Sequence, residues 1–391
     1  MKTVYYVGFY SSPEDNLRRK NVRQSIAGTV KMDFILKCLR KLDCKIVLVS
    51  IMPSQDSGFQ RQETIVVNDR ETHVYLPALV LRVFGKNIVR GDLSLFFLKR
   101  FLRKNVAKDD VVISYHSLVF GQFFQALRKK LGFRWVSQVE ELYRLSAEAH
   151  KNKELLWKEE KMIAGADGYL FVNDILPEKY AKQAPYAVSY GNYTVFLEER
   201  AKETNAAKKH IVVYAGIITE DSGVYLLIQA MRNLPSQYQL RIIGMGPDRN
   251  IEEMHRQIAY VNEKTEQGKV QYLGTKTGEE LTRFLAECDI GCSMLNTSDD
   301  FLVAFPSKIL TYLGHGLKVV ASRSACVTKS KLAPVLFFCD NNEEALAQTI
   351  VKAANSGFTG GSDCLRQMET SFCERLANVL DVPMKRVDGV M

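Results

Sequence analysis

The sequence has no run of 18 apolar residues, and its start lacks the basic, apolar and small-residue succession of a secretory signal. We therefore expect no transmembrane helix and predict a cytoplasmic protein, either free or peripheral on the inner face of the cell membrane. Its eight cysteines show neither paired zinc-site spacing nor a disulfide framework, so we interpret them as reduced and mostly buried thiols. We predict no metal and no cofactor.

Charge is distributed unevenly along the chain. Residues 1–190 hold 31 Lys and Arg against 20 Asp and Glu, a balance of +11, whereas residues 191–391 hold 22 against 24, a balance of −2. Basic clusters at residues 18–20, 99–104 and 128–134 lie partly beside Phe and Leu. They indicate either solvated helix faces or attraction to anionic lipid or a phosphate-bearing acceptor. We expect no nucleic-acid partner, because no nucleic-acid-binding motif accompanies the charge.

Short apolar runs alternate with helical stretches, and this pattern occurs twice along the chain. The length of 391 residues suffices for two domains. In the first half we expect helices near residues 24–42 and from about residue 117. Predicted strands lie at residues 3–9, 44–50, 110–115, 134–139 and 168–172. Near-continuous apolar strands alternating with helices predict a parallel sheet that is covered on both faces.

The pattern restarts after residues 197–210, a polar segment with the composition of a linker. Six apolar runs follow, at residues 210–216, 239–246, 269–274, 289–295, 317–322 and 334–338, and a helix is expected at 364–380. We predict two Rossmann-like, doubly wound α/β domains that face a central cleft, residues 1–195 and 196–362. A C-terminal helix and tail, residues 363–391, would pack back toward the N-terminal domain. Such sheets bind ligands at the carboxyl ends of their strands.

Glycines follow the predicted strands of the second half. Gly216 ends one strand with Gly223 at the head of the next helix, and Gly244 and Gly246 end another in "IIGMG". Glycine lets the backbone approach a ligand, although a tight turn that binds nothing would show the same pattern. A dehydrogenase is not favoured, because the third glycine and the acidic residue of a dinucleotide-binding fingerprint are missing.

The stretch "FPSKILTYLGHGLKVVAS", residues 305–322, predicts a helix that begins at Pro306 and stops at Gly314, followed by a buried strand. The capping position then falls to Phe305, whose side chain has no oxygen to accept the free N–H groups of Ser307 and Lys308. A ligand is one candidate for the missing acceptor.

Four segments in order, "YAGIITEDSGVYLLIQAM", "LRIIGMGPD", "VQYLGTKTGEELTRFLAECDIGCSML" and "FPSKILTYLGHGLKVVAS", resemble the donor-binding domain of retaining GT-B glycosyltransferases of family four, glycosyltransferase group 1. The resemblance is close over residues 210–322 and holds only in outline before them. It implies that the amides of Ser307 and Lys308 bind the diphosphate of a nucleotide sugar, most readily a UDP-sugar. The implied donor-binding residues are Gly216, Gly244, Gly246, Gly274, Phe305, Pro306, Ser307, Lys308 and Thr311.

Several family residues are replaced. The two glutamates of the usual motif correspond to Val303 and Thr311, the usual arginine to Ile217 and the usual lysine to Ser222. One interpretation is an active transferase in which Lys308 supplies the phosphate-binding charge. The other is an accessory subunit that has lost the chemistry and binds a partner transferase. A non-transferring GT-B enzyme, such as an epimerase, is a third and less favoured class.

The resemblance also suggests residues on the acceptor side. His116 follows one predicted strand, and Glu140 and Glu141 follow another, where many relatives have a His-Asp pair. We expect Glu140 to orient or partly deprotonate the acceptor hydroxyl, because neighbours on an extended chain face opposite ways and its place matches the acceptor-contacting residue. Gly8 would let the backbone approach the acceptor. Structural roles for His116 and Gly8 remain alternatives.

The predicted function is retaining, hexosyltransferase-type transfer from a nucleotide diphosphate sugar to a hydroxyl of a glycan or lipid-linked saccharide, in polysaccharide or glycoconjugate biosynthesis. The predicted partners are the donor, the acceptor and an anionic membrane surface. Asp299 and Asp300 lack the Asp-x-Asp spacing of a metal site and would reach sugar hydroxyls instead.

Overall fold

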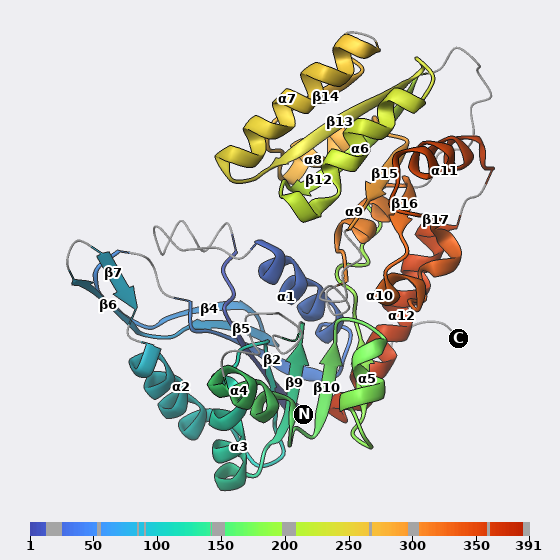
Figure 1. Cartoon of the computed structure of the whole chain (residues 1–391). Helices are drawn as coiled ribbons and strands as arrows, with labels where there is room; N and C mark the ends of the chain where they lie inside the picture. The colour runs from blue at the N-terminus through green and yellow to red at the C-terminus, as the bar shows by residue number, and fades with distance from the viewer. Residues whose placement is uncertain are drawn as a thin grey trace, which may run out of the picture. The chain divides into compact units, whose positions relative to one another are not determined.

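The computed structural model describes residues 1–12, 26–52, 56–83, 86–89, 91–140, 142, 153–197, 209–265, 268–295, 305–357 and 360–385. The chain divides into two compact units, Met1–Gly191 with Thr370–Met391, and Asn192–Glu369. Each unit is built on a largely parallel sheet with helices packed against it (Figure 1). The predicted division at residues 195 and 362 remains a proposal about where folding domains end.

The sheet of the first unit has the strand order β11-β10-β9-β8-β1-β2-β5-β4, and only β4 and β5 pair antiparallel. Its strands are β1 (Lys2–Gly8), β2 (Cys44–Ser50), β4 (Glu63–Asn68), β5 (Glu71–Tyr75), β8 (Val111–Ser114), β9 (Arg134–Val139), β10 (Gly168–Phe171) and β11 (Tyr186–Val188). The chain reverses direction across the sheet between β1 and β8, which is the switch point of a doubly wound fold. All five predicted strands of this half are present.

Helices of the first unit bury aromatic and aliphatic side chains, and those of α2 and α3 share one core with the sheet. They are α1 (Ile26–Leu39), α2 (Gly91–Asn105), α3 (Phe120–Leu131), α4 (Lys153–Ile163), α5 (Ile175–Tyr180) and the end of α12 (Gly361–Leu380). In α12, the ring of Phe372 packs 5.5 Å from the ring of Phe34 in α1. The α3 helix begins at Phe120, three residues later than the sequence predicts.

A separate three-stranded antiparallel sheet was not predicted. It consists of β3 (Gly58–Gln60), β6 (Ala78–Val83) and β7 (Lys86–Val89) in the order β3-β6-β7. Figure 1 shows β6 and β7 at one end of the first unit, with α2 beside them. With three and four residues, β3 and β7 are too short to show a continuous apolar run, whereas β6 reads ALVLRV and the sequence prediction missed it.

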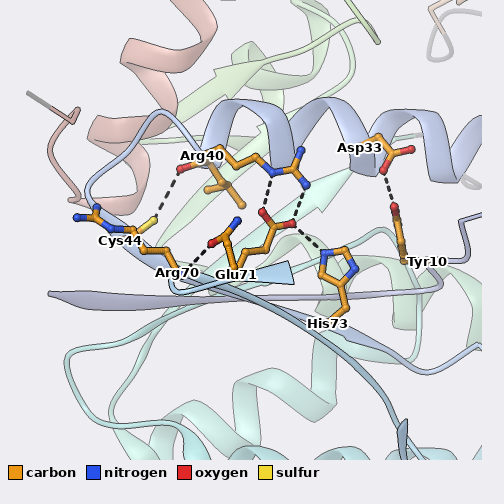
Figure 2. Close-up of polar contacts among 9 residues, drawn as sticks. Tyr10, Asp33, Arg40, Cys44, Arg70, Glu71 and His73 are labelled. Carbon is orange, nitrogen blue, oxygen red and sulfur yellow. Dashed lines mark hydrogen bonds and ion pairs between the residues drawn. The ribbon is translucent and has the colours of Figure 1, made fainter. Parts of the chain in front are cut away.

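A buried carboxylate ties α1 to β5. Glu71, at the start of β5, is 1% exposed. Its two oxygens each accept a hydrogen bond of 2.6 Å from the Arg40 guanidinium, and Nε2 of His73 lies 2.8 Å from Oε1. Figure 2 shows Arg40 and His73 pointing at this carboxylate from different elements. Burial alone would raise the pKa of Glu71, but the hydrogen bonds and charges of Arg40 and His73 outweigh it and lower the pKa to about 2.

Replacing Glu71 with glutamine is expected to lower the free energy of unfolding by about 2–3 kcal/mol, because the buried bidentate pair is broken while the half-exposed Arg40 keeps its contact with water. The native carboxylate has a lower pKa than the unfolded one, so its contribution is full above about pH 4.5 and is lost as the pH falls toward 2. Urea titrations at pH 7 and pH 3 measure both effects. The exposed Glu178→Gln serves as control, and equal loss in the two variants would contradict the assignment.

The second unit has a six-stranded parallel sheet in the order β14-β13-β12-β15-β16-β17. Its strands are β12 (His210–Ile217), β13 (Tyr238–Met245), β14 (Val270–Tyr272), β15 (Ile290–Ser293), β16 (Lys318–Ser322) and β17 (Phe337–Cys339). Numbered along the chain this is the order 3-2-1-4-5-6 of a nucleotide-binding Rossmann sheet, with its switch point between β12 and β15. All six predicted strands are confirmed, and with them the doubly wound fold class of both halves.

Helices pack on both faces of this second sheet. They are α6 (Val224–Ala230), α7 (Asp248–Lys264), α8 (Gly278–Leu285), α9 (Lys308–Gly314), α10 (Ala325–Thr328) and α11 (Glu343–Asn355). Side chains of α6, α7 and α11 share one apolar core with the sheet, to which β15 contributes Ile290 and Cys292. Gly291 between them faces Tyr312 of α9, so α9 covers the opposite face.

All eight cysteines are described, none forms a disulfide, and seven are buried, as the sequence predicts. In the described part of the chain, no helix combines the length and apolarity needed to cross a membrane.

Candidate functional site

The predicted donor-side glycines lie together at the carboxyl ends of β12, β13 and β14. A β-carbon added at Gly244 would lie 1.8 Å from the carbonyl oxygen of Gly216, and one added at Gly246 would lie 2.2 Å from that of Ile218. The amide of Gly244 donates to the carbonyl of Gly274 over 2.9 Å. Close main-chain packing therefore accounts for Gly244 and Gly246 by itself. It also leaves this edge of the sheet as bare backbone, which a ligand can approach closely.

Lys308 reaches over the end of β12. Its ammonium lies 4.1 Å from the ring centroid of the buried Tyr214 and 3.3 Å from the position that a β-carbon of Gly216 would occupy. Any side chain at position 216 would therefore crowd the ammonium. Loss of hydration lowers the pKa of Lys308 to about 8, an effect that the nearby Cys292 only partly opposes. A desolvated ammonium at the switch point of a Rossmann sheet is placed to bind an anion.

Helix α9 begins two residues later than predicted. Its first residue is Lys308, and its N-cap is Ser307 rather than Phe305. Pro306 opens a preceding turn in which its carbonyl accepts from the amide of Ile309 over 3.0 Å. Ser307 adopts helical backbone angles and its side chain makes no capping hydrogen bond. The predicted lack of a side-chain cap is thus correct, although the residue at the cap is not the one expected.

The C-terminal half of α9 is held at two points. The Tyr312 hydroxyl accepts from the amide of Ala215 in β12 over 2.7 Å. At the C-terminal end, the carbonyl of Gly314 accepts from the amides of Phe196 and Leu197 over 2.7 and 3.1 Å. Lys308 therefore stands on a helix that is held firmly against the strand whose end it covers.

Three of the four positions at which this chain lacks the usual family side chain are described by the structure. Ile217 is 66% exposed at the end of β12. The Ser222 hydroxyl is bound to the backbone of Thr219, donating over 2.6 Å and accepting over 3.2 Å. The Thr311 hydroxyl points back to the carbonyl of Ser307 at 3.5 Å. Val303, Asp299 and Asp300 lie outside the described residues.

On the first unit, His116 and Glu140 come together near the switch point of the sheet. The amide of Glu140, which directly follows β9, donates to Nδ1 of His116 over 3.2 Å. This bond places the ring proton of neutral His116 on Nε2. Burial lowers the pKa of His116 to about 4, and the charge of Glu140 opposes the shift only in part. His116 is therefore neutral at pH 7 and orients the main chain beside Glu140.

The Glu140 carboxylate has a different partner for each oxygen. Oε1 accepts from the Gln138 side chain over 2.5 Å, and Oε2 lies 3.5 Å from the ammonium of Lys31 in α1. The hydroxyl of Tyr6 in turn donates to Gln138 over 2.6 Å. The Glu140 side chain is 18% exposed and that of Lys31 is 8% exposed. Gln138 and Lys31 thus hold the Glu140 carboxylate, while part of the Glu140 side chain remains accessible.

Gly8 is the last residue of β1. A β-carbon there would lie 2.7 Å from Cε of Met32 and 2.9 Å from Cβ of Tyr115, so packing alone requires glycine. Glu141 lies outside the described residues.

Sequence reasoning missed Lys31 and Gln138. Lys31 belongs to the helix predicted near residues 24–42, and its ammonium also donates to the carbonyl of Ser189. Burial lowers the pKa of Lys31, and Glu140 opposes that shift. A buried lysine requires an anionic partner, but a sequence alone does not say which lysine is buried. Within the described ranges, no three potential metal ligands are grouped.

Residues 209–356 match the family model described as glycosyl transferases group 1. A comparison with curated proteins found no match. Among solved structures the chain is similar to sucrose-phosphate synthase from Thermosynechococcus elongatus, with 15% identity and a TM-score of 0.60 over 97% of this chain and 95% of that chain.

Two further structures have the same architecture. One is the UDP-forming α,α-trehalose-phosphate synthase from Burkholderia vietnamiensis, with 11% identity and a TM-score of 0.65 over 97% of each chain. The other is HepE from Anabaena in complex with UDP and glucose, with 13% identity and a TM-score of 0.62 over 97% of this chain and 100% of that chain. The chain therefore has the GT-B fold of these proteins, and its residues 209–356 form a glycosyl transferases group 1 domain.

Proposed function

We propose that the protein is a retaining glycosyltransferase that moves a sugar from a nucleotide diphosphate sugar to a hydroxyl of a glycan or lipid-linked saccharide. The observation that carries the proposal is Lys308, whose desolvated ammonium covers the end of β12 beside Gly216. This chain lacks the two glutamates, the arginine and the lysine of the usual family motif. In place of the missing arginine and lysine, Lys308 supplies one positive charge at the nucleotide-binding edge of the sheet.

In the transfer, the acceptor oxygen forms a bond to the anomeric carbon while the bond from that carbon to the diphosphate breaks. The leaving diphosphate takes the electron pair, and its developing negative charge is what the enzyme must stabilise. Lys308 supplies a full positive charge for this purpose, and its fixed position needs no rearrangement during the reaction. In this proposal, the main-chain amides of Ser307 and Lys308 bind the same diphosphate.

On the acceptor side, Glu140 accepts the hydrogen bond of the attacking hydroxyl and draws its proton away as the new bond forms. Lys31 and Gln138 hold the carboxylate in one orientation, which favours a single direction of attack. Neutral His116 fixes the main chain at the same point.

A UDP-sugar is the proposed donor, because the solved structures with this fold include one with bound UDP and one described as UDP-forming. Titration calorimetry with UDP, GDP, ADP and their sugar conjugates tests the proposal. We expect one nucleoside diphosphate, UDP, to bind with a micromolar dissociation constant. Tighter binding of GDP or ADP would leave the transferase proposal standing and change the donor.

An accessory subunit that binds a partner transferase is the second candidate. Two positions of the family motif favour it, because neither has a ligand-binding side chain. Ile217 is apolar and exposed, and the Ser222 hydroxyl is hydrogen-bonded to the backbone of Thr219. This candidate predicts that none of the three nucleoside diphosphates binds in the micromolar range, which would overturn the transferase proposal.

A further inference from the structure

The small antiparallel sheet of the first unit carries an apolar face. Opposed residues of antiparallel strands share a face, and the pairing sets Phe59 against Leu79 and Leu81 against Ile88. Alternation along β6 adds Val83 to Leu79 and Leu81. These five residues, which we name the β6 face, therefore form one contiguous apolar surface across three strands.

The β6 face is turned to solvent. Leu81, Val83, Ile88 and Phe59 are 36%, 37%, 47% and 59% exposed, respectively. The other side of the same strand is the buried one, since Ala78 and Val80 are each 1% exposed. Single exposed apolar side chains are common on proteins, but several on one sheet face mark an interaction surface.

Helix α2 extends this surface. The Phe59 ring lies 6.2 Å from the Phe97 ring of α2, which lies 5.6 Å from that of Phe96. Phe96 is 56% exposed. Apolar contact therefore continues from the sheet onto the first turns of the helix, while Leu98 and Leu102 on its other side are buried in the core of the unit.

Cations continue the exposed side of α2. They are Lys99, Arg100, Arg103 and Lys104, and all four are exposed. Their spacing of three and four residues from Phe96 and from one another places them on the same face of the helix as Phe96. None of the four makes an ion pair with any residue in the described part of the chain. Arg103 and Lys104 complement the helix dipole from the last turn, but that role does not account for Lys99 and Arg100.

We propose that the β6 face and the exposed side of α2 dock this protein on an anionic lipid bilayer. The five apolar side chains and Phe96 would enter the boundary between headgroups and acyl chains, and the four cations would contact lipid phosphates. The joint presence of apolar side chains and unpaired cations is the signature of an interfacial surface, since a solvated helix face has no reason to adjoin an apolar sheet. The proposal is independent of the transfer reaction.

Vesicle flotation of the full chain tests this proposal. The two vesicle types are phosphatidylcholine alone and phosphatidylcholine with phosphatidylglycerol at about two to one. We expect binding to the anionic vesicles that weakens as salt is raised, and little binding to the neutral ones. Equal partitioning onto both types, or no binding to either, would overturn it.

Paired variants locate the surface. Lys99→Gln with Arg100→Gln should weaken binding to anionic vesicles about 25-fold, because each charge contributes about fivefold. The matched control, Lys129→Gln with Lys130→Gln, removes the same charge from the exposed last turn of α3 and should change binding less than fivefold. Equal losses in the two pairs would mean that net charge, rather than this surface, drives binding.

Phe59→Ser with Ile88→Ser tests the apolar part. Both side chains are already exposed, so folding should be kept, which circular dichroism checks. Binding to anionic vesicles should fall at least about tenfold. An unchanged affinity would overturn insertion of the β6 face. A wild-type dimer in sedimentation that this variant converts to a monomer would show instead that a second copy of the chain covers the face.

Discussion

Replacing Lys308 with alanine is expected to weaken the binding of UDP by about 1.5–3 kcal/mol, or about 10-fold to 150-fold in dissociation constant, the scale of a hydrogen bond to a charged group. The ammonium lies over the end of β12, against Tyr214 and Gly216. Folding should be nearly unaffected, because the side chain is poorly hydrated in the free protein and makes no ion pair with a described residue.

Titration calorimetry with thermal unfolding of the same samples measures both quantities. Lys308→Arg keeps the charge and should lose less affinity than Lys308→Ala. The matched control is Lys352→Ala, which removes an exposed lysine from the last turn of α11 in the same unit. If folded Lys308→Ala binds UDP as tightly as the native chain does, Lys308 is not part of the donor site.

The pH dependence of binding gives a second test of Lys308. The pKa of its ammonium in the free protein is lowered to about 8, and a bound diphosphate favours the charged form. Affinity should therefore be greatest below pH 8 and fall as the pH rises through 8, by up to about tenfold per unit. Lys308→Ala should lose this slope. A slope that persists in Lys308→Ala would belong to another group.

Eleven strands of the two large sheets were predictable because each is a nearly continuous apolar run, whereas β4, β5 and β11 were not predicted. In a parallel sheet covered on both faces, nearly every strand residue is buried, so the sequence carries a continuous signal. The β6 face shows the opposite case. Its apolar residues come from three strands, and only the pairing of Phe59 with Leu79 and of Leu81 with Ile88 reveals that they form one surface.

The candidate site was predicted less completely than the fold. Lys308 follows from an uncapped helix start, a local pattern, although the structure moves that start from Pro306 to Lys308. Lys31 and Glu140 are over a hundred positions apart, and their pairing is set by the packing of α1 against the sheet. Glu71 and Arg40 meet for the same reason. Tertiary packing creates these pairs, so they cannot be predicted from the spacing of residues in the sequence.

Replacing Glu140 with glutamine is expected to lower turnover by about 10²-fold or more, the usual contribution of a positioned acid–base group, with UDP affinity nearly intact. Turnover is measured as acceptor-dependent release of nucleoside diphosphate. Glutamine keeps the shape and the hydrogen bond from Gln138 while it removes the charge that faces Lys31. Glu141→Gln should be milder, because adjacent residues of an extended chain face opposite ways.

A double variant separates a direct role of Glu140 from a structural one, because Glu140→Gln alone leaves the buried Lys31 without its anionic partner. If Glu140 served only to neutralise that ammonium, Lys31→Met with Glu140→Gln should restore turnover, since no unpaired charge remains. If Glu140 acts on the acceptor hydroxyl, the double variant stays as slow as Glu140→Gln, whatever its stability. Full turnover in Glu140→Gln and Glu141→Gln alike would move the search for the acceptor site to His116 and the chain after Gly8.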